Sequence, residues 1–358
     1  MENRGLIFIP DISGFTRFVN ETEIEHSRYI IQELLELLIN ANQIGLEISE
    51  IEGDAILFYK YGDAPDLNAI YKQVEKMFCE FHRHLMAYEQ RRLCQCVACK
   101  SANDLSLKVI THYGEFTGYT VKNFSKLIGK DIILAHQLLK NDIEQHEYWL
   151  VTNGLIQNRL QENLPDWVNW NSSAKQTDNG EVPFQYIQLG PLKDTIPPET
   201  PLQLEINDKV KIFSVSKEFD AEINTLFYTA VDFSSRQKWQ AGVKKADEVS
   251  HTLPQVGTHH RCVLEKGQVN MYTSSFSYSP DKIVYSETDD KKKTSGYFTF
   301  EKLAENKTKA TFDFYLKNDF VMLTMFRLFM KKKWEKGLQQ SLENLAEVVK
   351  GVKLPVEL

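Results

Sequence analysis

A cluster of prolines near the middle of the chain constrains its architecture more than any other feature. Four of them stand close together: Pro191, Pro197, Pro198 and Pro201. Proline cannot donate a hydrogen bond to a sheet and favours an extended conformation in the residue before it, so a regular element should not cross this stretch. A chain of 358 residues is also long for one hydrophobic core. We therefore predict two domains, residues 1–189 and 209–358, joined by a linker over 190–208.

The first predicted domain alternates strands and helices. Unbroken apolar runs indicate buried strands, and apolar residues at helical spacing indicate helices. The predicted order is a strand over 5–10, a helix over 27–44, strands over 46–52 and 55–61, a helix over 67–89, a strand over 105–112, a helix over 130–139, and strands over 148–151 and 184–189. Gly53-Asp54 separates the second and third strands, as expected for a tight hairpin turn. This order predicts an α+β domain, a mixed sheet with helices packed on it.

The second predicted domain has a different order of secondary-structure elements. Its segments are a strand over 211–219, a short helix over 221–231, strand-like runs over 258–265, 269–278, 282–288, 296–303 and 310–317, and a helix over 323–349. In the last run Phe312, Phe314 and Leu316 alternate with more polar residues, which is typical of a sheet with one buried face. The final helix is amphipathic. We expect an antiparallel sheet packed against one long helix.

Composition excludes several classes of protein. The net charge of −7 argues against general binding of nucleic acid, which needs a basic face. No apolar stretch is long enough to cross a bilayer, and the apolar run 5–9 is too short for a signal peptide. The five cysteines are an odd number, with three in one loop, which favours a reducing compartment over a disulfide framework. We expect a cytoplasmic protein without integral membrane segments.

Two carboxylates stand where apolar runs stop beside a glycine. Asp11 follows the first strand and precedes Gly14, and Asp54 follows Gly53 in the predicted hairpin. Two carboxylates at neighbouring strand ends suit a hard divalent cation that also binds a triphosphate.

Three motifs around these residues resemble the class III nucleotidyl cyclase family, over roughly residues 5–152. They are DISGFT at 11–16, EIEGDA at 50–55 and LKVITHYGE at 107–115, the last similar to a strand that ends in a histidine-threonine-glycine turn, with Tyr113 in place of the threonine. The resemblance is to a degenerate bacterial subfamily of the DUF2652 type. It implies a ferredoxin-like cyclase fold and a site for Mg²⁺ or Mn²⁺ at Asp11 and Asp54. It also implies a purine nucleotide bound near Phe15, Thr16, Glu50, Lys130 and Gln137.

Glu50 occupies the position that contributes to purine choice in this family, where a glutamate is similar to guanylyl enzymes. An equally good interpretation is that Glu50 is the polar side of an alternating strand. The family also places an asparagine and an arginine on a helix after a glycine. Aligned on residues 129–138, those positions hold Ile133 and Gln137. In that family the arginine supplies a preorganised positive charge near the phosphates. Loss of such a charge typically costs ~10²–10³-fold in rate, so turnover should be weak or absent. Lys122, Lys130 or Lys140 are possible substitutes.

A single copy of the cyclase-like domain implies a homodimer, because the family builds its site between two such domains. A structural Zn²⁺ site is a separate hypothesis. Cys94, Cys96 and Cys99 lie within six residues, and His82 precedes them on the predicted helix. A set of three cysteines and a histidine would satisfy tetrahedral zinc, although small buried cysteines explain the same pattern.

The second domain resembles the START-like helix-grip superfamily (SRPBCC, polyketide-cyclase-like), with residues 236–243 similar to its early tryptophan segment. The resemblance implies an apolar cavity for a hydrophobic small molecule. Trp239, Phe276, Phe298 and Phe312 could line it, although each is individually more typical of a packed core. His259 and His260 should point to opposite faces of a strand, one exposed and one buried. Residues 331–333 are three lysines beside apolar residues, which we interpret as a solvated helix face rather than a membrane contact.

Three functions are compatible with these features. We prefer a cyclase-like nucleotide- and metal-binding module coupled to a hydrophobic-ligand module, with a regulatory role. The alternatives are an active purine nucleotide cyclase with non-standard transition-state residues, and a binding protein whose first half is only a dimerisation scaffold. Ile133 and Gln137 argue against an active cyclase, and the two aspartates argue against a mere dimerisation scaffold.

Overall fold

The computed structural model describes residues 3–22, 24–93, 97–156, 164–177, 180–198, 208–248, 256–265 and 267–352. The chain divides into two compact units, the first formed by 1–89 and 97–199, the second by 90–96 and 200–358. Each contains helices and a large sheet, so the mixed α and β composition predicted from the sequence is confirmed. No helix within the described ranges is long and apolar enough to span a membrane.

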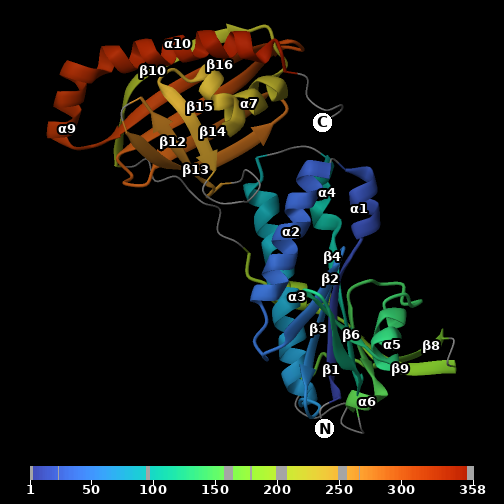
Figure 1. Cartoon of the computed structure of the whole chain (residues 1–358). Coiled ribbons are helices and arrows are strands. Elements are labelled where there is room, and N and C mark those ends of the chain that lie inside the picture. Colours follow the sequence, from blue (N-terminus) through green and yellow to red (C-terminus); the bar gives the residue numbers. More distant parts are fainter. Residues whose placement is uncertain are drawn as a thin grey trace. The chain divides into compact units, whose positions relative to one another are not determined.

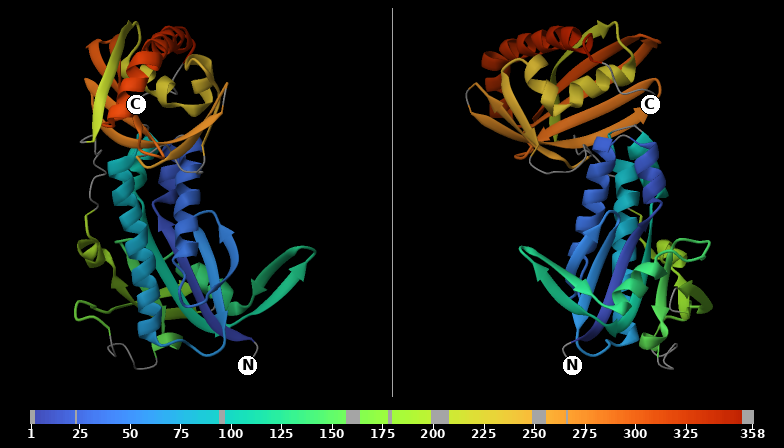
Figure 2. Two further views of the ribbon diagram at one scale, coloured as in Figure 1. Left: turned by 90° about the vertical axis from the view of Figure 1, so that its left-hand side faces the viewer. Right: turned by 45° about the vertical axis from the view of Figure 1, so that its right-hand side comes forward.

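Unit 1 is built on a seven-stranded sheet in the order β2-β3-β1-β4-β7-β9-β8. Its strands are β1 (Arg4–Ser13), β2 (Glu47–Glu52), β3 (Ala55–Tyr61), β4 (Ser106–Glu115), β7 (Tyr148–Thr152), β8 (Asn171–Thr177) and β9 (Gly180–Gln188). Among the described strands of this sheet, only β4 and β7 pair in parallel. A separate two-stranded hairpin, β5 (Thr117–Val121) and β6 (Phe124–Ile128), reaches out from this sheet (Figure 2). The central strand β1 is buried on both faces, which explains its nearly continuous apolar sequence.

Helices cover both faces of this sheet (Figure 1). They are α1 (Phe15–Glu21), α2 (Ile24–Asn40), α3 (Leu67–Arg91), α4 (Val97–Ser101), α5 (Lys130–Leu138) and α6 (Asn153–Ile156), with 3₁₀ turns at Ala102–Asp104 and Gly190–Thr195. On one face, Tyr71 of α3 packs against Trp149 of β7. On the other, α5 buries its apolar side in a cluster that contains Ile7 and Ile9 of β1. The 3₁₀ turn at Gly190–Thr195 begins the predicted linker, and its Leu192 is buried.

Unit 2 contains a seven-stranded antiparallel half-barrel sheet. Its strands are β10 (Lys209–Phe219), β11 (Val243–Glu248), β12 (His259–Leu264), β13 (Gln268–Ser279), β14 (Lys282–Asp289), β15 (Thr294–Ala304) and β16 (Lys307–Lys317). Strands β11 to β16 form a meander, and the first strand, β10, pairs with the last, β16. The helices are α7 (Ile223–Val231), α8 (Phe233–Trp239), α9 (Phe320–Met325), a π-helical turn (Phe326–Met330) and α10 (Lys331–Val349).

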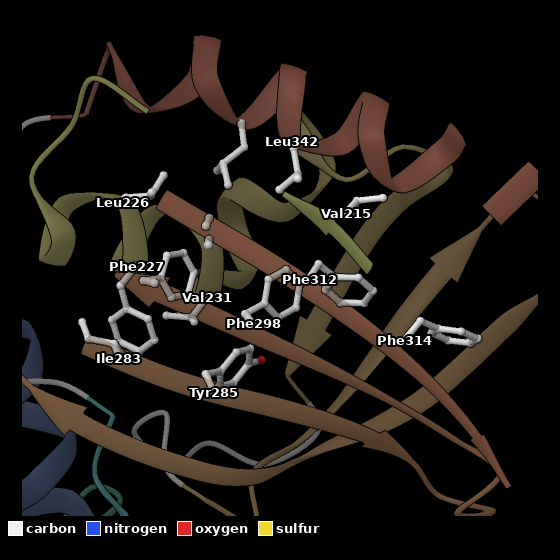
Figure 3. Close-up of a cluster of buried hydrophobic side chains, with 14 of the residues drawn as sticks. Val215, Leu226, Phe227, Val231, Ile283, Tyr285, Phe298, Phe312, Phe314 and Leu342 are labelled. Carbon is white, nitrogen blue, oxygen red and sulfur yellow. The ribbon is translucent and has the colours of Figure 1, made fainter. Parts of the chain in front are cut away.

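The core of unit 2 lies between the concave face of the sheet and its helices (Figure 3). Leu342 of α10 and Phe227 of α7 pack onto aromatic rings of the central strands, among them Phe298 and Phe312. Gly296 on β15 makes room for this packing, since a Cβ there would lie 2.8 Å from the Phe312 ring. The inward residues of β14 to β16 include Tyr285, Phe298, Phe300, Phe312 and Phe314, which explains the alternation of aromatic and polar residues in the sequence.

Candidate functional site

Asp11 lies near the end of β1, on the face covered by α5. Its antiparallel neighbours are Ala55 on β3 and Lys108 on β4. Gly14 then takes a left-handed conformation, with φ of 89°, and starts α1. A side chain is strained in this region, whereas glycine is not. The strand therefore stops just past the carboxylate, which is only 8% exposed.

Asp54 is brought beside Asp11 by the hairpin between β2 and β3. Gly53 occupies a left-handed position, with φ of 63°, as the tight turn requires. The Ile12 N–H donates to the Asp54 carbonyl oxygen at 3.0 Å, which ties this turn to the end of β1. The predicted convergence of the two aspartates is thus formed by a strand end and a hairpin turn.

Lys108 is a third charged group at this point, and the sequence did not identify it. Its Nζ lies 3.7 Å from Asp11 Oδ2 and donates to the Leu139 carbonyl oxygen at 3.2 Å. The antiparallel register of β1 and β4 places Asp11 and Lys108 directly opposite each other, so their side chains share one face. The carbonyl oxygen at the C-terminal end of α5 and the carboxylate thus hold one ammonium group between them.

Burial dominates the protonation of both carboxylates. The pKa of Asp11 is raised to about 6, mainly by desolvation, while Lys108 lowers it and the charge of Asp54 adds to the increase. Desolvation also raises the pKa of Asp54, again opposed by Lys108. An additional cation would favour the ionised form of both groups, because it restores the electrostatic stabilisation lost on burial.

These residues line a hollow of about 800 Å³ between the β1 end, the β2–β3 turn and α5. Of the nucleotide-binding residues predicted from the sequence, Phe15, Thr16 and Gln137 line it together with the two aspartates. Ile133 of α5 and Lys140, just after that helix, line it as well. Magnesium is usually held by one or two protein carboxylates, with phosphates and water supplying the other ligands. Asp11 and Asp54 fit that pattern. No set of three or more His, Cys, Asp or Glu side chains within the described ranges could hold a metal alone.

Glu50 and Lys130 are not among the residues that line the hollow. Glu50 lies on β2 opposite Leu57, and its carboxylate pairs with Lys126 of the projecting hairpin. This contact raises the pKa of Lys126. Lys130 is exposed at the first position of α5. The role of both residues in purine binding therefore stays a prediction.

The third motif fixes the position of α5 relative to the sheet. Asp131 in the first turn of α5 accepts a hydrogen bond from the Glu115 N–H at 2.6 Å, and its other oxygen lies 3.2 Å from His112 Nε2. Gly114 permits this approach, since a Cβ there would lie 2.4 Å from Asp131 Cγ. Burial lowers the pKa of His112, which Asp131 partly offsets. His112 and Gly114 thus orient the helix that carries Gln137.

The predicted zinc ligands are only partly described. Cys94 and Cys96 lie outside the described residues, and Cys99 is buried on α4. His82 is buried on α3, with Nε2 3.5 Å from Ser106 Oγ and its ring against Phe78. Desolvation lowers the pKa of His82 to about 3, so the ring is neutral at pH 7. The zinc hypothesis stays a prediction.

In unit 2 the residues predicted to line a cavity lie in or against the aromatic core. The ring of Phe298 lies 4.5 Å from that of Phe312 and 6.3 Å from that of Trp239. Phe276, which is partly buried, stacks on Phe227 at 5.6 Å. Their role in ligand binding stays a prediction.

A buried charged cluster adjoins this core, and sequence reasoning missed it. Both Arg236 terminal nitrogens donate to the Glu287 carboxylate, at 2.9 and 2.6 Å, and one also donates to Tyr285 Oη at 3.2 Å. Arg236 lowers the pKa of Glu287 to about 2 against the effect of burial. His260 Nε2 lies 3.2 Å from Arg236 Nη1, whereas His259 is exposed and pairs with Asp290. The predicted division of the two histidines between core and surface is confirmed.

Comparisons with known proteins agree with part of this picture. A model of the family described as "Protein of unknown function (DUF2652)" matches residues 31–148. The uncharacterized protein Rv2561/Rv2562 of Mycobacterium tuberculosis is 30% identical over 125 residues, which are 35% of this chain and 58% of that protein. The chain thus spans less than two thirds of the length of this curated relative.

Solved structures of nucleotide cyclases are also similar to this chain. One is the guanylate cyclase domain of RhGC from Catenaria anguillulae in complex with GTP, with 12% identity and a TM-score of 0.38, covering 52% of this chain and 97% of that one. Another is the adenylyl cyclase CyaB from P. aeruginosa, with 16% identity and a TM-score of 0.36, covering 52% and 94%.

Proposed function

We propose that the hollow of unit 1 binds Mg²⁺ or Mn²⁺ together with the phosphates of a purine nucleotide. The observation that carries this proposal is the meeting of Asp11, Asp54 and Lys108 at one point of the hollow. Two buried carboxylates supply hard oxygen ligands for a divalent cation, and phosphate oxygens would complete its coordination. The bound cation would supply charge neutralisation to the phosphates.

The chain's own residues would position the nucleotide around that cation. Lys108 can pair with a phosphate once a metal replaces it at Asp11, because an ammonium group is a compact donor without a fixed direction. The backbone that turns at Gly14 and the half-buried ring of Phe15 form one wall of the hollow. Gln137 of α5 and Lys140, just after that helix, form another. We propose the ferredoxin-like cyclase fold for unit 1 on the strength of its three motifs and this placement.

Turnover by this site should be weak or absent, and its role regulatory. Ile133 and Gln137, the α5 residues at the family's asparagine and arginine positions, both line the hollow, and neither can neutralise charge that develops on a phosphate. A missing preorganised donor of this kind typically costs about 10²–10³-fold in rate. Lys140 lines the hollow but is exposed, so its charge is screened by water.

We propose a homodimer in which a second copy packs against the apolar surface beside this site. A groove of about 530 Å³ runs between α1, α2 and β2, with Ile24 and Ile51 exposed along it. Phe15 lines both this groove and the hollow. On the projecting hairpin Phe124 is 75% exposed. Exposed apolar groups that cluster in this way mark interaction surfaces. Light scattering tests the dimer, and a monomer at all concentrations would contradict it.

For unit 2 we propose a START-like helix-grip fold that binds a hydrophobic small molecule. A curved sheet lined by aromatic rings and closed by α10 is the support for this part. Ligand binding would couple the aromatic core to the nucleotide site in a regulatory protein.

One experiment separates this proposal from its alternative, an active purine nucleotide cyclase. ATP and GTP are each titrated with Mg²⁺ or Mn²⁺, and pyrophosphate and cyclic product are measured in parallel. We expect saturable nucleotide binding that Asp54→Ala abolishes, with little or no product. Product that forms in the parent chain and disappears in Asp54→Ala would establish the active cyclase instead. Binding that survives the loss of both aspartates contradicts every metal-based version.

A further inference from the structure

The helical segment before α10 exposes an unusual amount of apolar surface. Phe320 is 83% exposed, and Leu328 and Phe329 are each 71% exposed. Together with Val321, Met325 and Trp334 they form what we call the apolar face. Single exposed apolar residues are ordinary, but a set spread along about four successive helical turns marks an interaction site.

The segment that carries the apolar face is packed firmly against the core of unit 2. On the inner side of the same segment Leu323 and Phe326 are buried, and the Phe326 ring stacks on Phe314 of β16 at 5.4 Å. Asp319 caps α9 by accepting a hydrogen bond from the Met322 N–H at 2.8 Å. The turn Phe326–Met330 is π-helical, a rare conformation that is frequent at functional sites. The outward residues are therefore held in a defined arrangement. Trp334 lies at the edge of this face, because its ring also packs against Phe314 and Phe326, at 5.1 and 5.8 Å.

The charge of this segment is opposite to that of the chain. Between Phe320 and Trp334 the charged residues are Arg327 and the three lysines at 331–333, with no carboxylate among them. The whole chain has a net charge of −7. The cations thus gather beside the apolar face, where they complement an anionic surface.

We propose that this segment docks unit 2 onto an anionic phospholipid bilayer, with the apolar face buried at the level of the headgroups. A helix with aromatic and leucine side chains on one face and lysines beside them is typical of interfacial membrane binding. Lysine can bury its methylenes and leave its ammonium group at the headgroups. A protein interface instead tends to be depleted of lysine. The docking surface revises the interpretation of residues 331–333 as a simple solvated face.

Flotation of the full chain with vesicles tests the proposal. We expect binding to vesicles with roughly one third phosphatidylglycerol, at least about tenfold stronger than to phosphatidylcholine alone, and weakened by salt. Leu328→Ser/Phe329→Ser should reduce binding by at least about tenfold, because it removes two of the most exposed apolar groups. Lys332→Glu/Lys333→Glu should reduce it by a similar factor, since each basic residue near such a surface contributes about fivefold.

Two matched variants in the same unit serve as controls. Leu303→Ser removes an exposed apolar side chain on β15, and Lys291→Glu/Lys293→Glu reverses two exposed charges at the β14–β15 turn. Both should bind vesicles like the parent chain. Absence of binding by the parent chain, or equal binding by the segment variants and the parent, overturns the proposal. If the parent ignores vesicles but Leu328→Ser/Phe329→Ser dissociates an oligomer in light scattering, a second copy covers this face instead.

Discussion

Lys108 and Asp11 face each other across the β1–β4 pair, with Nζ 3.7 Å from Oδ2, at the mouth of the proposed cation site. The ammonium group occupies the neighbourhood that a divalent cation needs. It therefore has two opposing effects on metal binding, since it lowers the pKa of Asp11 and repels a second cation.

Replacement of Lys108 by methionine should separate these effects. Without the ammonium group the pKa of Asp11 rises above about 6, so the pH midpoint of Mn²⁺ binding should move upward. Well above that midpoint, Mn²⁺ alone should bind about tenfold more tightly, and a nucleoside triphosphate more weakly. Isothermal titration at several pH values measures both. Lys72→Met, at an exposed position on α3 away from the hollow, is the control and should change neither.

Gly114→Ala should loosen α5, because the new Cβ would lie 2.4 Å from Asp131 Cγ. We expect a destabilisation of about 1–3 kcal/mol, typical of overpacking. Hydrogen exchange of the α5 amides measures it. Gly118→Ala is the matched substitution, since the nearest atoms to its Cβ are 4.0 Å away. Equal exchange rates in the two variants would argue against the role assigned to Gly114.

The Arg236–Glu287 pair should show the asymmetry of buried ion pairs. Arg236→Met or Glu287→Leu alone leaves an uncompensated buried charge and should cost about 3–5 kcal/mol, whereas the double variant should recover most of that loss. Exchange protection of the β13–β15 amides reports the stability of unit 2. The exposed Lys282–Glu301 pair gives the reference, where single and double changes should have little effect. Additive losses at Arg236 and Glu287 would refute the coupling.

His260 should make unit 2 sensitive to mild acid. Burial lowers its pKa to about 4 from 6.5, so the unfolded chain binds a proton first as the pH falls. The contribution of neutral His260 to the free energy of unfolding of unit 2 is constant above about pH 6.5. It is lost as the pH falls from there toward 4. Between pH 7 and 5 the loss is about 2 kcal/mol. His260→Gln should flatten this dependence in exchange measurements. His259→Gln, at the adjacent exposed position, is the control and should retain the pH dependence of the parent chain.

Much of unit 1 could be predicted because its determinants are local. Gly53 marks the hairpin that carries Asp54, and the apolar run before Asp11 marks a buried strand, so both carboxylates could be placed at strand ends. Lys108 could not be found, because the register of β1 against β4 depends on pairing across about a hundred residues rather than on a local signal. The hairpin of β5 and β6 was missed for a different reason. Its turn places Lys122 at φ of 56°, where a glycine or asparagine would have given a signal.

In unit 2, too, features with local determinants could be predicted and those that depend on long-range contacts could not. Alternating aromatic residues predict its strands, and β11 was missed because its polar sequence has no apolar face. Arg236 lies in a polar stretch of the sequence, and only tertiary contact with Glu287 explains its burial. A buried charge with a distant partner leaves no periodic signature in the sequence.

The most direct test of the central claim is the affinity for Mn²⁺ and a nonhydrolysable GTP analogue, measured by electron paramagnetic resonance. We compare the parent chain with Asp11→Asn and Asp54→Asn, and with Glu115→Gln, at the exposed last residue of β4, as a control. Two carboxylates that share a cation predict saturable Mn²⁺ binding in the parent and in Glu115→Gln. That binding should fall about tenfold per pH unit below pH 6 and be lost in both aspartate variants. Mn²⁺ binding of equal strength in all four proteins would contradict the account.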